Sequence, residues 1–226
     1  MAELDTLDLE TLDLETGANP TAAIIWMHGL GADAHDFESF LPFLDLGPGC
    51  PVRYVFPNAP VRPVTLNGGM QMRAWYDLLS MDRNAAEDEA GIRDSATGID
   101  ALIAREIARG IAPERIVMAG FSQGGAMALF TALRYPERLA GVLALSTYLP
   151  LAAAVSEERT DVNAALPIFM AHGDVDAVVP VNFARNSRKR LTGLGHEVEW
   201  HEYPMPHSVS PPELEDIKEF LGRLLN

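Results

Sequence analysis

Short strand-like segments alternate with amphipathic helical segments along most of the chain, and this alternation constrains the fold more than any other feature. The strand-like segments are residues 22–27, 52–56, 115–119, 140–145, 167–171 and 197–203. The segments with apolar residues at helical spacing are residues 37–44, 87–109, 123–134, 181–194 and 211–225. This alternation predicts an α/β protein with a mainly parallel central sheet and helices on both faces. Ligands of such sheets bind beyond the carboxyl ends of the strands, so residues directly after strands are the candidates for function.

Two segments depart from the alternation. Residues 7–11 (LDLET) repeat directly as residues 12–16, which is typical either of an edge strand with acidic outer positions or of a solvated tail. We therefore expect an acidic N-terminal segment over residues 1–19 and a single domain over residues 20–226. Residues 58–81 are rich in proline, glycine and methionine. We expect them to be a functional loop, because unstructured segments of this length are uncommon in compact domains.

The charge balance excludes several kinds of partner. The formal net charge is -15, which repels phosphate backbones and anionic lipids, so we expect no nucleic-acid partner and no stable membrane association.

The chain has no apolar run of membrane-spanning length and no signal-peptide layout at its N-terminus, so we expect a cytoplasmic protein. The single cysteine, Cys50, cannot form an internal disulfide, which fits a reducing compartment. The oligomeric state stays open, a homodimer included.

A nucleophile motif lies between a predicted strand and a predicted helix. Residues 120–124 (GFSQG) match G-x-S-x-G, and this strand-to-helix position is the context in which the motif forms a nucleophile elbow. The glycines on either side relieve the crowding around a serine held on a sharp turn. The N-terminal N–H groups of the following helix point toward the same place. Ser122 is therefore the predicted nucleophile.

A serine nucleophile requires a base, and the base requires an orienting acid. In folds with this elbow, the chain order is serine, then an acid, then histidine. Residues 172–176 (HGDVD) follow one predicted strand and residues 205–208 (MPHS) follow another, so both lie at the same sheet edge as Ser122. The residues alone leave Asp174 and Asp176 as alternatives for the acid.

The motifs together resemble one known family. The segments GFSQGG at 120–125, HGLG at 28–31, AWYD at 74–77 and HGDVD at 172–176 look like the phospholipase/carboxylesterase family, which includes bacterial carboxylesterases and acyl-protein thioesterases. The resemblance runs from about residue 20 to the C-terminus. It implies the α/β-hydrolase fold and the triad Ser122, Asp176 and His207. It also implies an oxyanion hole formed by the backbone N–H groups of Leu30 and Gln123, so the side chains of these two residues should matter little.

The resemblance also gives the other acidic and loop residues an expected role. Asp174 becomes a loop-stabilising carboxylate that accepts backbone hydrogen bonds. The loop over residues 66–81 should help to shape the acyl pocket, and we expect Trp75, Met70 and Leu78 to contact substrate. Trp75 and the methionines Met70, Met72 and Met81 are typical either of core packing or of a pocket lining, and their crowding in a long loop favours the pocket. Pro206 is a departure from the family pattern, because many relatives have glycine before the histidine.

The expected activity is a carboxylesterase that works through an acyl-enzyme without cofactor or metal. No H-E-x-x-H segment and no G-x-G-x-x-G segment after the first strand is present, which disfavours zinc catalysis and a dinucleotide. Small esters, S-acylated proteins and lysophospholipids stay open as substrates. The alternative function is a non-catalytic acyl-ligand-binding protein on a hydrolase scaffold. The intact set of serine, aspartate and histidine favours the enzyme.

Overall fold

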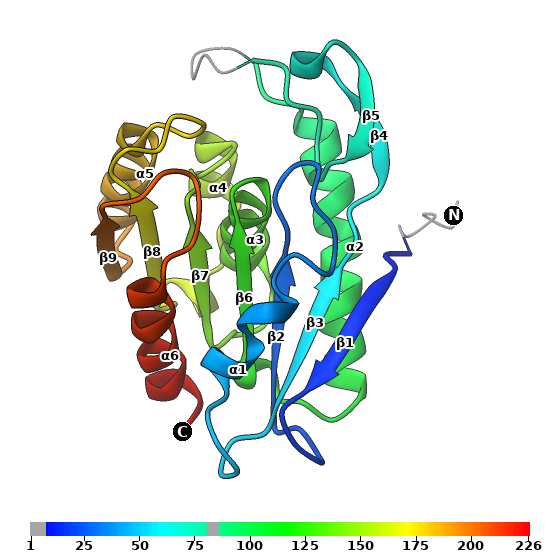
Figure 1. The fold of residues 1–226 in the computed structure, drawn as a ribbon, viewed down its shortest axis with the longest axis vertical. Helices are drawn as coiled ribbons and strands as arrows, with labels where there is room; N and C mark the ends of the chain where they lie inside the picture. Colours follow the sequence, from blue (N-terminus) through cyan, green and yellow to red (C-terminus); the bar gives the residue numbers. More distant parts are fainter. Residues whose placement is uncertain (1–7, 81–85) are drawn as a thin grey trace.

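A single mixed sheet forms the centre of the molecule (Figure 1). The computed structural model describes residues 8–80 and 86–226. The strand order is β1-β3-β2-β6-β7-β8-β9, in which β1 pairs antiparallel with β3 and every other pairing is parallel. The strands are β1 (Thr11–Glu15), β2 (Ala22–Met27), β3 (Val52–Pro57), β6 (Ile116–Phe121), β7 (Gly141–Leu145), β8 (Ile168–Gly173) and β9 (Val198–Tyr203).

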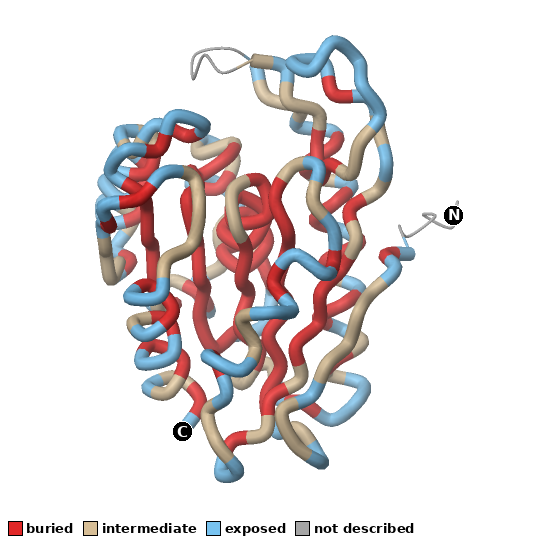
Figure 2. The backbone as a smooth tube through the Cα atoms, viewed as in Figure 1, coloured by how far each residue is buried: buried red, intermediate tan, exposed pale blue. Residues whose placement is uncertain are grey.

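Helices cover both faces of this sheet, as the alternation predicts. The helices are α1 (Leu41–Leu44), α2 (Glu89–Ala108), α3 (Gln123–Arg134), α4 (Ala152–Glu158), α5 (Val181–Gly193) and α6 (Pro211–Leu225). Alternate residues of β2 point to opposite faces: Ile25 packs with α2 and α3, whereas Ile24 packs with α1 and α6. Figure 2 shows the buried strands enclosed between these two layers. The carboxyl ends of the parallel strands therefore meet at one edge, where the predicted site residues follow them.

Three segments differ from the sequence-based expectations. Residues 58–80 contain a two-stranded hairpin of β4 (Val61–Val64) and β5 (Met70–Arg73), which lies beyond the main sheet at the top of Figure 1. Residues 37–44 form only a 3-10 turn and the four-residue helix α1. The helix α4 was not predicted from the sequence. Met81 lies outside the described residues.

The acidic repeat contributes its second copy to the sheet as β1. Asp13 forms ion pairs with Arg105 at 3.1 Å and with Arg109 at 2.8 Å on α2. The fully buried Glu106 pairs with Arg53 at 2.7 Å and contacts both α2 arginines. Arg53 also reaches Glu15 at 2.9 Å, so one network of charges joins β1, β3 and α2.

No helix in the described ranges is both long enough and apolar enough to cross a membrane.

Candidate active site

Ser122 lies on a sharp turn between β6 and α3. Its backbone has φ 55° and ψ -120°, a conformation that L-residues rarely adopt and that requires support from the surroundings. The Ser122 N–H donates to the Leu145 carbonyl at 2.8 Å, and the hydroxyl of Thr147 donates to the Ser122 carbonyl at 2.6 Å. A Cβ at Gly120 would lie 2.3 Å from Gly124, and one at Gly124 would lie 2.2 Å from the Met27 carbonyl oxygen. The two glycines of the motif are therefore required by close packing of the backbone.

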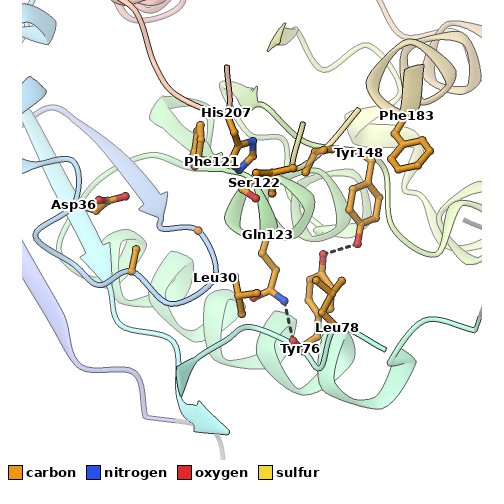
Figure 3. Close-up of a pocket in the computed structure, with 14 residues that line it drawn as sticks. Leu30, Asp36, Tyr76, Leu78, Phe121, Ser122, Gln123, Tyr148, Phe183 and His207 are labelled. Atoms are coloured by element: carbon orange, nitrogen blue, oxygen red, sulfur yellow. Dashed lines mark hydrogen bonds between the residues drawn. The ribbon is translucent and has the colours of Figure 1, made fainter. Parts of the chain in front are cut away.

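His207 and Asp176 come together from different loops at the carboxyl edge of the sheet. The Nδ1 atom of His207 lies 2.6 Å from Oδ2 of Asp176. The Asp176 side chain is fully buried, and its Oδ1 accepts hydrogen bonds from the N–H groups of Val178 and Val179, both at 2.8 Å. These contacts, together with His172 Nε2 at 3.3 Å from Oδ2, hold the carboxylate in one orientation. In Figure 3 the imidazole of His207 lies beside Ser122.

The loop-stabilising hydrogen bonds expected from Asp174 are made by Asp176 instead. Asp174 is exposed, and within the described ranges its carboxylate has no hydrogen-bond partner. The position of Asp176 explains the difference, because the turn after β8 directs its side chain inward toward the N–H groups two and three residues ahead.

Pro206 is accommodated in the loop before His207. A Cβ on Gly173 would lie 2.2 Å from the Met205 carbonyl oxygen and 2.5 Å from that of Pro206. The histidine loop therefore packs directly on the glycine at the end of β8. This packing fixes the loop with proline at position 206, and His207 still reaches Asp176.

A cavity of about 240 Å³ opens next to Ser122. Ser122, His207, Leu30 and Gln123 line it, and most of its wall is apolar (Figure 3). The apolar wall consists of Tyr76, Leu78, Tyr148, Val178, Val179 and Phe183. The hydroxyl groups of Tyr76 and Tyr148 lie 2.9 Å apart within this wall. A cavity of this lining suits a hydrocarbon chain.

The two predicted oxyanion residues both lie at this cavity. Gln123 is the first residue of α3, and Leu30 lies in the turn after β2. Across the part of the chain that the structure describes, neither backbone N–H group donates a hydrogen bond to another protein group. Neither amide is therefore engaged by the described part of the protein.

The side chain of Gln123 has a structural role that the sequence analysis missed. Its Oε1 accepts a hydrogen bond from the Trp75 N–H, and its Nε2 donates to the Tyr76 carbonyl, both at 2.8 Å. The residue is buried, with 5% of its surface exposed. Gln123 thus ties the nucleophile turn to the segment that forms one wall of the cavity. Gln123 and Trp75 are 48 residues apart in the chain, so no local sequence pattern indicates that they pair.

The three residues predicted to contact substrate lie in different places. Leu78 lines the cavity. Trp75 is fully buried behind it, and its indole N–H donates to the His28 carbonyl at 2.9 Å. Met70 is 63% exposed on the outer hairpin and does not line the cavity. The hairpin explains this, because β5 turns Met70 away from the sheet edge.

The histidines beside the site satisfy backbone groups. The Nε2 atom of His28 accepts the Ala59 N–H at 3.0 Å, so its Nδ1 carries the proton toward the Gly29 carbonyl at 2.7 Å. Burial lowers the pKa of His28, which favours this neutral form. His172 contacts the Val179 carbonyl at 2.7 Å. Within residues 8–80 and 86–226, no three His, Cys, Asp or Glu side chains are grouped to hold a metal ion.

These features define an α/β-hydrolase: the sheet is mainly parallel, a serine elbow follows a central strand, and a histidine–aspartate pair lies at the same edge. The chain belongs to the phospholipase/carboxylesterase family, whose model matches residues 14–225. An acyl-protein thioesterase 1 of Mycosarcoma maydis is 41% identical over 225 residues, which cover 93% of this chain and 94% of that protein. A second acyl-protein thioesterase 1, of Neurospora crassa, is 41% identical and the match covers 92% and 89% of the two chains.

Solved structures agree with this assignment. Zea mays acyl-protein thioesterase 2 has a TM-score of 0.86 and 28% identity, covering 96% of this chain and 99% of that one. Arabidopsis thaliana SOBER1 has a TM-score of 0.85 and 30% identity, covering 91% and 99%. The predicted family and the predicted fold class are confirmed. The protein is a serine hydrolase of ester or thioester bonds, as the motifs indicated.

Proposed function

We propose that Ser122 attacks the acyl carbonyl, that His207 takes the serine proton and later gives it to the leaving group, and that Asp176 orients His207. The observation that carries this proposal is the 2.6 Å contact between Asp176 and His207 at the cavity that holds Ser122. Asp176 has its other oxygen occupied by two backbone N–H groups, so it presents one oxygen to the imidazole. Such a carboxylate fixes the histidine tautomer and stabilises the imidazolium.

The oxyanion of the tetrahedral intermediate would be held by the N–H groups of Leu30 and Gln123. Both residues line the cavity beside Ser122, and the first turn of α3 adds the positive end of its dipole. The acyl chain would occupy the apolar wall between Tyr76 and Phe183. Water then releases the acid from the acyl-enzyme.

The substrate class within this reaction is proposed from the relatives. Two acyl-protein thioesterases are about two-fifths identical over nearly the whole chain. We therefore propose thioesters of acylated proteins as substrates, with small carboxylic esters as artificial ones. The cytoplasmic location and a dimer stay predictions.

An activity-based probe tests the proposal directly. A fluorophosphonate should label the wild type at Ser122, and Ser122→Ala should lose the label and nearly all hydrolysis of a short chromogenic ester. Ser156→Ala, on an exposed turn of α4, serves as the matched control and should keep both. Full labelling or hydrolysis by folded Ser122→Ala would refute the mechanism. A wild type that neither takes the label nor hydrolyses the ester would instead favour the acyl-binding alternative.

A further inference from the structure

A second, smaller groove shares part of its lining, His207 included, with the candidate acyl cavity. It is lined by Phe37, Phe40, Ser208 and Val209, together with three residues that also line the first cavity. The three shared residues are Asp36, Phe121 and His207. Ser122 and the two proposed oxyanion residues line only the first cavity. The imidazole of His207 therefore borders both a space that contains the nucleophile and one that does not.

The proposed reaction gives these two spaces different occupants. The leaving atom is bonded to the acyl carbon at Ser122 and takes its proton from His207, so it lies between these two side chains and the rest of the alcohol or thiol extends past His207. The acyl chain fills the apolar cavity next to Ser122, which leaves the second groove for the leaving group. The rings of Phe121 and His207, with centroids 4.6 Å apart, form the boundary between the two.

Asp36 is the one acidic side chain at this boundary that lines both spaces. It lies in the turn after β2, and among the residues that the structure describes no basic side chain forms an ion pair with it. Partial desolvation, with the nearby charge of Asp33 adding to it, raises the pKa of Asp36 above its ordinary value. Asp36 is exposed, so water solvates its charged form, and a cation in the groove would add a direct attraction to this carboxylate.

Aromatic rings complete the groove around this carboxylate. Phe37 and Phe40 meet edge to face with centroids 5.4 Å apart, and Phe37 lies 5.9 Å from Phe121. A row of rings beside a carboxylate is the setting in which proteins hold ammonium groups, because the ring faces attract cations.

We propose that Asp36 is a specificity-determining residue that favours esters and thioesters whose leaving group carries a positive charge. This inference rests on the proposed function, because it takes Ser122 and His207 as the reacting pair. The positive charge could belong to a small quaternary ammonium alcohol or thiol, or to a basic residue beside an S-acylated cysteine. Asp36 takes no part in bond making, so its removal should change the hydrolysis of cationic substrates more than that of neutral ones.

A matched pair of thioesters measures this preference. S-butyrylthiocholine and its neutral isostere S-(3,3-dimethylbutyl) thiobutyrate share the acyl group and the shape of the leaving group. Both release a thiol that can be followed with the same reagent. The wild type should have a higher kcat/KM for the cationic ester, and Asp36→Asn should lower the ratio of the two values about fivefold at low salt, in the range of a partly exposed ion pair. Asp36→Lys should lower the ratio further.

Glu38→Gln is the control for net charge. Glu38 is exposed, lies two residues away and lines neither cavity, so its substitution should leave the ratio unchanged. An equal ratio in wild type and Asp36→Asn would overturn the proposal, and so would an equal fall in Glu38→Gln. Absence of hydrolysis of both thioesters by the wild type would instead refute the proposed function. Circular dichroism shows that each variant is folded.

Peptides separate the two sources of the charge. An S-butyryl-cysteine peptide with lysine next to the cysteine is compared with the same peptide carrying norleucine. An Asp36-dependent preference for the lysine peptide identifies a basic protein segment as the leaving group. The same dependence confined to the thiocholine ester identifies a small cationic one. If neither the preference for the lysine peptide nor the preference for the thiocholine ester depends on Asp36, the inference is wrong.

Discussion

Truncation of Gln123 should weaken the fold much more than it slows the reaction. Gln123→Ala removes the buried amide that pairs with the Trp75 N–H and the Tyr76 carbonyl, both at 2.8 Å. Each buried backbone group left without a partner costs about 1–3 kcal/mol. With partial relaxation of the loop, the free energy of unfolding should fall by about 2–4 kcal/mol. For a chain of this size, that corresponds to a fall in Tm of about 5–15 °C.

The rate should respond differently, because alanine keeps the backbone N–H of residue 123. We expect kcat to fall no more than about tenfold, equivalent to about 1.4 kcal/mol. Loss of an oxyanion donor would cost about 10²–10³ in rate. Gln123→Glu adds a sharper comparison, since it keeps an acceptor for the Trp75 N–H but removes the donor to the Tyr76 carbonyl. Its stability should lie below that of the wild type although its shape is nearly the same.

The assay combines urea unfolding with kcat on a short chromogenic ester at a temperature where every variant is folded. Gln71, the other glutamine in the chain, is exposed on β5, and Gln71→Ala is the control that should change neither quantity. A change below about 0.5 kcal/mol in Gln123→Ala would mean that the bridge adds no stability. A thousandfold loss of kcat in folded Gln123→Ala would assign the oxyanion contact to the side chain and overturn the backbone role.

Three further outcomes follow from the site and its surroundings. Asp176→Asn should lower kcat by up to about 10⁴ while Asp174→Asn stays near wild type; a loss confined to Asp174→Asn would exchange their roles. Phe183 lines both the acyl cavity and a neighbouring one, so Phe183→Ala should move the preference in an ester series to longer acyl chains, and an unchanged optimum would contradict this. Burial raises the pKa of Glu213 from 4.5 to about 8, so the folded protein keeps a proton that the unfolded chain releases, and stability should fall as pH rises between these values. In urea titrations from pH 5 to 8, the free energy of unfolding of Glu213→Gln should no longer fall with pH. A fall equal to that of the wild type would show that Glu213 is not its source.

The sequence predicted most strongly those features that depend on neighbours in the chain. The strand over 22–27 and the helix over 123–134 have the predicted bounds, because their apolar spacing matches the burial that each element has in the sheet. The serine motif was recognisable for the same reason, since its glycines and its turn lie within five residues. The hairpin of β4 and β5 was missed although Asn67, Gly68 and Gly69 supply its turn. Pro63 and the few apolar residues on either side hide the pairing.

Features that depend on distant partners could not be predicted from the residues alone. The choice between Asp174 and Asp176 needs the direction of each side chain after β8, and only the family resemblance favoured one of them. The Gln123 bridge and the position of Asp36 between two cavities arise from contacts across tens of residues. Trp75 was expected in the pocket because it lies among methionines in a long loop, yet its indole N–H donates to the His28 carbonyl.

Because of the tandem repeat, the sequence of the edge strand β1 also occurs directly before it in the chain. Residues 6–10 and 11–15 are the same pentapeptide, TLDLE. A slip of one repeat along β3 would therefore present the same side chains to the arginines of α2, and the ladder itself does not distinguish the two registers. The connection after Thr16 makes the distinction, because Gly17 packs against Pro51 and Asn19 turns the chain at φ 54° toward β2. A slipped strand would lengthen this turn by one repeat. Loss or gain of one five-residue repeat would thus change the number of residues before β1 and leave the sequence of the strand itself the same.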